Sequence, residues 1–164
     1  MLNTKRKMKK KNFINHILMV IAGLVICLTS CNNETDGGPD PEGTAIANIT
    51  KGTYYNSGIN VGGGGGIYIS ESINFHETPG VGWSDVLFYD FGKVKGLADV
   101  DKIVESGWSG GVAVLVNHGY LLKIINYYYP SDISYGRLYV TKFLENTNGG
   151  IIGAQVKLQY PFVP

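Results

Sequence analysis

The sequence has very little cysteine, and what it has lies near the N-terminus. Its two cysteines are Cys27 and Cys31. Cys27 lies inside an apolar run that we interpret as part of a signal peptide, and Cys31 directly follows that signal. The rest of the chain therefore has no thiol for a disulfide, a cysteine metal site or a thiol nucleophile. A domain without disulfides depends on its own hydrophobic core, so we do not expect a very small one.

Long hydrophobic runs are also lacking. The clean apolar segment, residues 17–28, has twelve residues, whereas a membrane span needs about 20 and the core of a signal peptide about 7–15. Six basic residues within the first eleven positions precede this segment. We therefore predict a helical signal peptide over residues 1–30, and the alternative is an uncleaved signal anchor.

The predicted signal ends in Leu28-Thr29-Ser30-Cys31, which looks like a bacterial lipobox. In lipoproteins of that type the cysteine becomes the N-terminus and carries diacylglycerol on its sulfur, with palmitate-like chains. Each buried methylene contributes about 0.8 kcal/mol, and two or more chains hold a protein stably at a bilayer. We expect Cys31 to anchor the protein in the outer membrane, on either the periplasmic or the cell-surface side.

Positive charge is scarce after the signal. Eight basic residues stand against thirteen acidic residues after residue 31, a formal net charge of −5. No basic run remains, so we do not expect binding to nucleic acid. Residues 31–43, CNNETDGGPDPEG, contain four acids and no apolar residue besides the cysteine. We predict a flexible, disordered tether there and a single domain over residues 44–164.

Helical periodicity is hard to find in this domain, and its composition is that of a β protein. All eleven tyrosines follow residue 31, and short β-branched and aromatic runs alternate with glycine-rich turns. We expect an all-β fold, either an antiparallel β-sandwich or a partly open barrel of about 7–9 short strands. The expected strands cover 45–50, 67–75, 85–95, 112–116, 120–127, 135–145 and 151–160, with one short helical turn within 97–105.

Two turns give the C-terminal half its expected order. Residues 117–119 are predicted to join 112–116, a central strand, to 120–127 as a hairpin, with Gly119 at positive φ. Residues 146–150, NTNGG, form the strongest turn signal in the chain. The last strand alternates, which predicts one dry face with these residues: Ile152, Ala154, Val156, Leu158 and Tyr160.

Four motifs stand out in this half: Ser106-Gly107-Trp108, His118-Gly119-Tyr120, Arg137-Leu138-Tyr139-Val140, and the ending from Gly149 to Phe162. Together with the lipoprotein leader, the stretch from Phe91 to Phe162 resembles a family of small lipoproteins of Gram-negative gut anaerobes, whose domain has no assigned function. The chain departs from that pattern at Val104-Glu105, where a proline is common, and at Asn117, where a glycine is common. The resemblance implies a mostly β fold and no catalytic residue.

Catalytic patterns are weak. Ser109 has glycine at −2 and +2, but a nucleophile elbow needs a helix after it, and a strand is predicted there. His118 has no second histidine at ligand spacing, and a site joining it to His76 and Glu77 rests on residue type alone. The five glycines 62–66 lack the Lys-Ser/Thr of a phosphate loop, so we interpret them as a strand connection. We expect no enzyme activity, metal or cofactor.

The aromatic content is the most suggestive functional feature. Successive side chains of an extended chain point to opposite faces, so at least one ring of Tyr127-Tyr128-Tyr129 should be exposed. Trp83 and Trp108 each lie in a loop-like Gly-Trp-Ser context. Exposed flat rings on a β scaffold bind sugars or peptide partners, although such rings also fill cores. The candidate binding residues are Trp83, Trp108, His118, Tyr120 and Tyr128.

These observations favour a non-catalytic module that binds a glycan or an envelope protein. The alternative is a structural or accessory subunit of an outer-membrane complex. A hydrolase using Ser109 and His118 is the least favoured hypothesis.

Overall fold

The computed structural model describes residues 38–52, 58–78 and 83–164. Within these ranges the chain forms nine strands and one 3-10 helix, with no α-helix. The predicted signal peptide, Cys31 and the first part of the predicted tether lie outside the described residues. In the described part of the chain, no helix has the length and apolar character that crossing a membrane requires.

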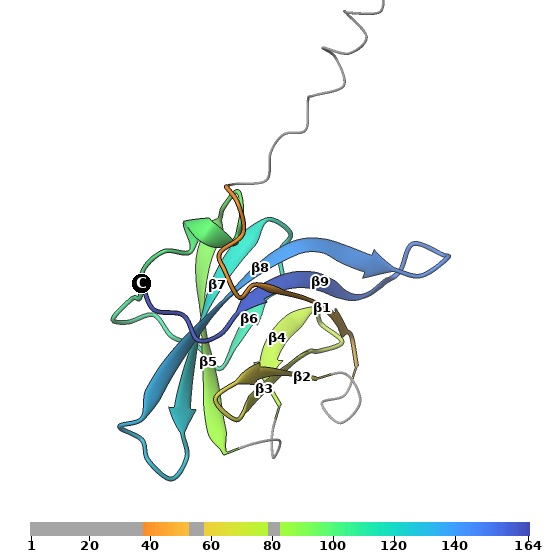
Figure 1. The fold of residues 1–164 in the computed structure, drawn as a ribbon. Helices are drawn as coiled ribbons and strands as arrows, with labels where there is room; N and C mark the ends of the chain where they lie inside the picture. Colours follow the sequence, from red (N-terminus) through yellow and green to blue (C-terminus); the bar gives the residue numbers. More distant parts are fainter. Residues whose placement is uncertain (1–37, 53–57, 79–82) are drawn as a thin grey trace, which may run out of the picture. The chain divides into compact units, whose positions relative to one another are not determined.

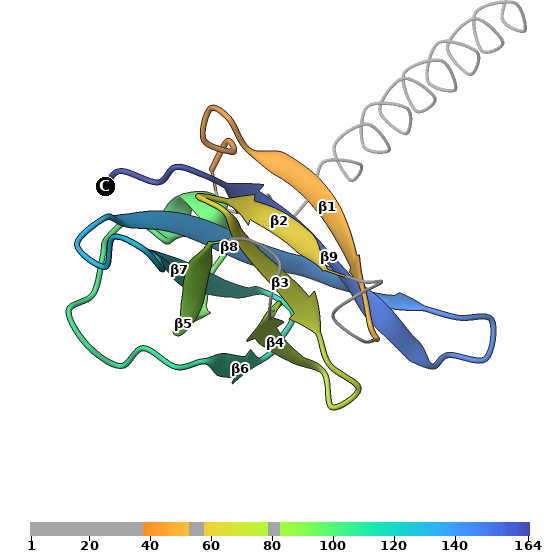
Figure 2. The ribbon, with the colours of Figure 1, turned by 90° about the horizontal axis from the view of Figure 1, so that it is seen from below.

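The strands form two antiparallel sheets. Figures 1 and 2 show a four-stranded sheet, in the order β2-β3-β4-β6, beside a five-stranded sheet in the order β1-β9-β8-β7-β5. The larger sheet contains β1 (Ala45–Thr50), β5 (Ser84–Lys93), β7 (His118–Asn126), β8 (Ile133–Glu145) and β9 (Ile151–Gln159). The smaller contains β2 (Ile59–Gly62), β3 (Gly65–Ile69), β4 (Asn74–Glu77) and β6 (Gly111–Ala113). The described strands do not close into a barrel, so of the two predicted architectures the β-sandwich is the one that forms.

The main core lies between the two sheets. Alternate residues of each strand point inward, as the strand period of two requires. Phe75 of β4 stacks on Phe88 of β5 at 6.1 Å between ring centroids, and it meets Tyr120 of β7 edge-on at 5.3 Å. The fully buried aliphatic members from both sheets are Ile49, Val61, Ile67, Ile69, Val86, Leu122, Ile124, Leu138, Val140, Ala154 and Val156.

A second, smaller cluster covers the outer face of the five-stranded sheet. The β5–β6 connection, which contains the 3-10 helix η1 (Leu97–Asp99), contributes Val100 to it, and Leu121 and Phe162 complete its buried part. Arg137 of β8 is 8% exposed and donates a hydrogen bond of 2.8 Å to the Val100 carbonyl. Its guanidinium carbon also lies 4.5 Å from the centre of the Phe162 ring. Arg137 therefore ties the connection and the C-terminal segment to the sheet.

The N-terminal strands depart from the sequence prediction. The chain forms β2, which was not expected, and the expected strand 67–75 is divided into β3 and β4. Ile73 lies at the division with a φ of +59°, and its N–H donates to the Ser70 carbonyl at 3.0 Å. A left-handed residue is incompatible with an extended strand, so the chain reverses there. The short apolar run could not indicate this reversal because isoleucine ordinarily favours strands.

The expected hairpin between 112–116 and 120–127 is wrong. β6 ends at Ala113 and is an edge strand of the smaller sheet, whereas β7 belongs to the larger sheet. The intervening residues cross between the layers, and Asn117 takes the positive φ (+64°) that was assigned to Gly119. Gly119 serves packing, since a Cβ there would lie 2.3 Å from Val100 Cγ2. The run 112–116 is apolar because the crossing passes the core edge, where Val114 is buried.

The remaining elements lie close to their expected positions. β1, β5, β8 and β9 are confirmed within two residues of the expected ends, and only η1 forms within 97–105. On β9, Ala154, Val156 and Leu158 are buried as predicted, whereas Ile152 is 42% exposed because it lies at the β8–β9 turn. Ordered contacts begin before residue 44, since Asp40 pairs with Lys157 at 3.1 Å.

Candidate functional site

The inward-facing rows of neighbouring strands turn polar at one end of the sandwich. On β5 and β7, Val86 lies opposite Ile124, and Ser84 lies opposite Asn126 one step outward. On β8, Ser134 lies opposite Ile124. Because inward positions recur every second residue, these polar side chains continue the rows of the core. The core thus ends in hydroxyl and amide groups at this end.

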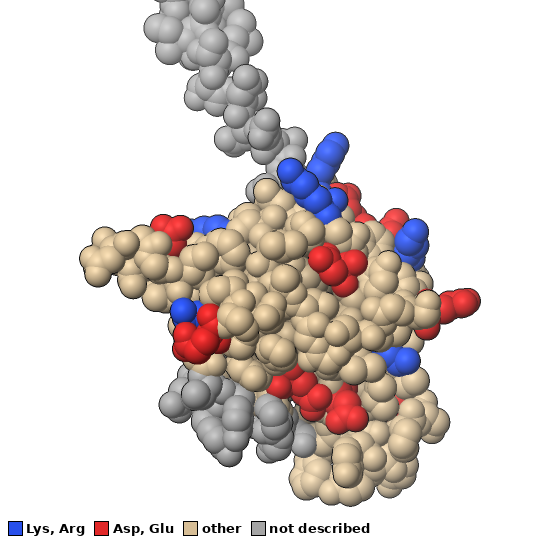
Figure 3. Space-filling model, turned by 180° about the vertical axis from the view of Figure 1, so that it is seen from behind, with Lys and Arg blue, Asp and Glu red and all other residues tan. Residues whose placement is uncertain are grey.

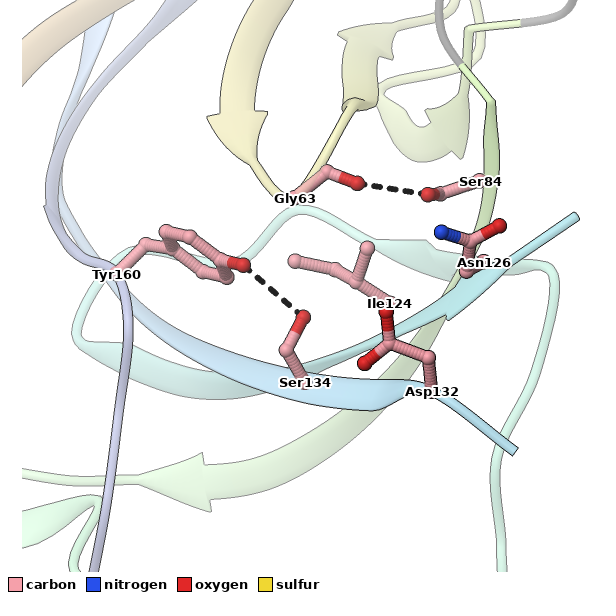
Figure 4. Close-up of a pocket in the computed structure, with 7 residues that line it drawn as sticks. All are labelled: Gly63, Ser84, Ile124, Asn126, Asp132, Ser134 and Tyr160. Carbon is pink, nitrogen blue, oxygen red and sulfur yellow. Dashed lines mark hydrogen bonds between the residues drawn. The ribbon is translucent and has the colours of Figure 1, made fainter. Parts of the chain in front are cut away.

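These polar side chains surround a pocket of about 100 Å³, the polar pocket (Figure 4). Its lining residues are Gly63, Ser84, Ile124, Asn126, Asp132, Ser134 and Tyr160. The Ser84 hydroxyl donates to the Gly63 carbonyl at 2.7 Å, and the Tyr160 hydroxyl donates to Ser134 Oγ at 3.1 Å. The Ser84–Gly63 bond connects the two sheets across the pocket, and the Tyr160–Ser134 bond joins the end of β9 to β8 within the larger sheet.

The five-glycine run forms one wall of this pocket, as the β2–β3 turn. Gly62 has a φ of +97°, and a Cβ there would lie 2.0 Å from Cδ1 of the Tyr160 ring. A Cβ on Gly65 would lie 2.6 Å from Val86 Cγ2. The glycines therefore let the backbone lie directly on the larger sheet. The run is a strand connection, as predicted.

Beside the pocket lie four exposed aromatic side chains, which we call the aromatic cluster: Trp83, Tyr127, Tyr128 and Tyr129. Their exposed fractions are 64%, 69%, 60% and 68%, which is high for rings that usually bury most of their surface. Trp83 and Tyr128 lie 5.3 Å apart between ring centroids, and Tyr127 meets Tyr128 edge-on at 5.8 Å. Figure 3 shows the β7–β8 end as a lobe, at the lower right, that lacks Lys and Arg.

Residues of the polar pocket also hold the aromatic cluster in place. Asn126 Oδ1 accepts the N–H groups of Tyr128 at 2.9 Å and Tyr129 at 3.2 Å. The Tyr127 N–H donates to the Trp83 carbonyl at 2.6 Å, and the Asp132 N–H donates to the Tyr129 carbonyl at 2.7 Å. The pocket and the cluster therefore form one connected site at the end of the sandwich.

Two of the five candidate binding residues, Trp83 and Tyr128, come together in this site. Trp108 is half-buried on the outer face of the larger sheet, between the rings of Tyr89 at 6.2 Å and Tyr135 at 6.0 Å. Lys123 Nζ lies 5.8 Å from the centre of the Trp108 ring. Trp108 thus serves the second hydrophobic cluster, on the face away from the pocket.

Tyr120 belongs to the core and has no surface for a ligand. It is 0% exposed, and its hydroxyl donates to the Ala113 carbonyl at 2.8 Å and accepts from the Leu115 N–H at 2.9 Å. Burial raises the pKa of Tyr120 above its usual range; the bond from Leu115 opposes this rise, and the nearby charge of Asp90 adds to it. Its role is to tie the crossing between the sheets to β7.

His118 pairs with Asp90 rather than with a catalytic partner. Its Nδ1 lies 3.0 Å from Asp90 Oδ1, between β7 and β5. Ser109 pairs with Phe88 of β5, and His118 lies opposite Lys93 of β5. Phe88 and Lys93 are about 16 Å apart along this strand. The structure does not bring Ser109 and His118 together. The described residues also contain no group of three or more His, Cys, Asp or Glu arranged to hold a metal.

Sequence reasoning missed the polar pocket. A signal was present: the alternating rows of β5, β7 and β8 end in Ser84, Asn126 and Ser134. The rows coincide only when the strand register is known, because each polar residue alone resembles an ordinary strand end. Tyr160 joins them from β9's end, a position that only the sheet order sets beside Ser134.

No protein-family model, no curated protein and no solved structure matches this chain. The resemblance to the small-lipoprotein family therefore stays a prediction. The function must be argued from the site itself.

Proposed function

We propose that this chain is a lipid-anchored, non-catalytic glycan-binding module of the cell envelope. The observation that carries the proposal is the aromatic cluster, whose four rings are exposed beside a pocket lined with hydroxyl, amide and carboxylate groups. Sugar rings offer apolar C–H faces that pack on flat aromatic surfaces, and hydroxyls that need polar partners.

The site combines two properties that suit a saccharide better than an apolar peptide anchor. Hot spots for peptides are well-packed, desolvated pockets, whereas Ile124 is the single aliphatic side chain among the lining residues of the polar pocket. The backbone bonds of Asn126 also hold the rings before a ligand arrives. Such preorganisation lowers the entropy lost on binding.

The location is proposed from the leader sequence. The basic n-region, the short apolar core and the lipobox support acylation of Cys31 and attachment to the outer membrane. Intact-mass analysis of the protein purified from membranes tests this. Acyl chains on Cys31 are expected, and a Cys31→Ala variant that still fractionates with membranes would contradict the anchor. Protease shaving of intact cells then distinguishes the cell-surface side from the periplasmic side.

A glycan array probed with the purified full chain in detergent tests the binding function. We expect saturable binding that is lost in Trp83→Ala and Tyr128→Ala. Ile46→Ala is the matched control, since Ile46 is 67% exposed on β1 and lies outside the aromatic cluster. A blank array, or binding that all three variants retain, would contradict the proposal.

One observation supports an accessory subunit as the second candidate. β1 is an edge strand of the larger sheet, and its exposed Ile46 offers an apolar contact beside unpaired backbone groups. Pull-down from solubilised membranes with a cross-linkable residue at position 46 tests it. A partner captured there, together with a blank glycan array, would favour this role over glycan binding.

A further inference from the structure

This inference rests on the proposed function and concerns the kind of saccharide that the site selects. The polar pocket contains one charged side chain among its lining residues, that of Asp132. Figure 4 shows its carboxylate among the lining side chains, near Ile124 and Ser134. Asp132 is exposed, and no ion pair to it is formed within the described residues. Its negative charge is therefore available to a ligand.

The hydrogen-bonding groups of the pocket are mostly acceptors. The Ser84 and Tyr160 hydroxyls already donate their protons to Gly63 and Ser134, so lone pairs remain on both oxygens. The Asp132 carboxylate accepts only. Two backbone N–H groups point at Asn126 Oδ1, which orients its NH₂ as one donor of the pocket. The Ser134 hydroxyl, whose oxygen accepts from Tyr160, supplies the other.

The one lysine of β7, Lys123, does not neutralise the negative charge of Asp132 in the polar pocket. Lys123 precedes Ile124, so it points to the opposite face, where it lies over the Trp108 ring. Two further carboxylates lie near the start of β5 but do not line the pocket: Asp85 precedes Val86 and points to the opposite face, and Glu77 ends β4. Burial and the charge of Asp85 raise the pKa of Glu77, although a hydrogen bond from the Val86 backbone opposes the rise. Among the residues that line the pocket, the charge therefore comes from Asp132.

We propose that the polar pocket selects saccharides that present hydrogen-bond donors, with amino sugars bound most tightly, neutral hexoses next, and uronic acids rejected. A protonated amine adds charge attraction to Asp132, whereas a carboxylate meets repulsion and finds few donors. The aromatic cluster contributes stacking equally to all three because their ring faces are alike.

The test uses an array of matched tetrasaccharides of glucose, galactose and mannose, together with their 2-amino and uronate counterparts. For the full chain in detergent, we expect uronates to bind at least about tenfold more weakly than the neutral sugars. Asp132→Asn should bring the three classes close together. Glu145→Gln is the control, because Glu145 lies at the far end of β8, about 40 Å along the strand.

The outcomes separate this inference from the proposed function. Uronates bound as well as neutral sugars, with binding still lost in Trp83→Ala, would overturn the selectivity and leave glycan binding intact. A preference that Asp132→Asn leaves unchanged would overturn the role of Asp132. Failure of every saccharide would overturn both. Thermal unfolding of the variant shows whether it is folded, and a preference that weakens with salt is expected from its electrostatic origin.

Discussion

Replacing Gly62 with alanine tests how the glycine run shapes the polar pocket. Gly62 has a φ of +97°, and the added Cβ would lie 2.0 Å from Tyr160 Cδ1. Two separate costs are therefore expected. A left-handed conformation costs an alanine about 1–2 kcal/mol, and overpacking against a ring costs about 1–3 kcal/mol. The lower chain entropy of alanine in the unfolded state offsets about 0.4–1 kcal/mol.

Two other glycines separate these costs. Gly149 has a φ of +76° with nothing within 4 Å of its Cβ position, so Gly149→Ala carries only the conformational cost. Gly65 has no positive φ, but its Cβ would lie 2.6 Å from Val86 Cγ2, so Gly65→Ala carries only the steric cost. We expect Gly62→Ala to be about 1–3 kcal/mol less stable than Gly149→Ala.

Urea unfolding with linear extrapolation measures these differences, and each kcal/mol should lower Tm by roughly 3–6 °C for a domain of this size. Displacing the Tyr160 ring also disturbs its bond to Ser134, so Gly62→Ala should weaken glycan binding while Gly149→Ala leaves it unchanged. Equal stability of Gly62→Ala and Gly149→Ala would refute the close approach of the β2–β3 turn to Tyr160.

Three further predictions concern buried polar groups. Tyr120→Phe should lose about 1–3 kcal/mol in urea unfolding because two backbone groups lose their partner. The pKa of Tyr120 is raised in the folded state, so its contribution to the free energy of unfolding is present below the ordinary tyrosine pKa of about 10 and is lost as pH rises above it. If the wild type and Tyr120→Phe lost the same amount of stability above this pH, the assignment would be contradicted. Thr78 Oγ1 is buried without a hydrogen-bond partner among the described residues, so Thr78→Val should gain about 1 kcal/mol in thermal unfolding while Thr78→Ser loses stability; a destabilised Thr78→Val would show that the hydroxyl is used. Arg137→Leu should lower the free energy of unfolding by about 2–3 kcal/mol, because the buried Val100 carbonyl loses a charge-assisted hydrogen bond and Phe162 loses its stacking partner. Amide hydrogen exchange around Val100 should become faster in this variant, and unchanged exchange would contradict the prediction.

The sequence predicted exposed rings in the candidate site, but it did not predict which rings come together. Alternation along an extended chain predicts that at least one ring of Tyr127–Tyr129 is exposed. All three are exposed, because β7 ends at Asn126 and the three tyrosines lie in the connection that follows it. The contact of Tyr128 with Trp83 does not follow from local geometry, since these residues are far apart in the chain and meet only because β5 pairs with β7. Trp108 and Tyr120 have the same residue types as the exposed rings, yet they are packed on the outer cluster and in the core.

The sequence by itself determined the all-β class, most strand positions and the glycine-rich turns, because alternation and turn chemistry act over a few residues. The tertiary structure alone decided which sheet each strand joins. In it, the expected strand 67–75 is divided at Ile73, β6 belongs to the smaller sheet, and Tyr120 is buried. The tertiary structure also aligned Ser84, Asn126 and Ser134 into one pocket. These outcomes depend on pairing between distant segments, whose energy comes from burial and register across the whole sandwich rather than from any local pattern.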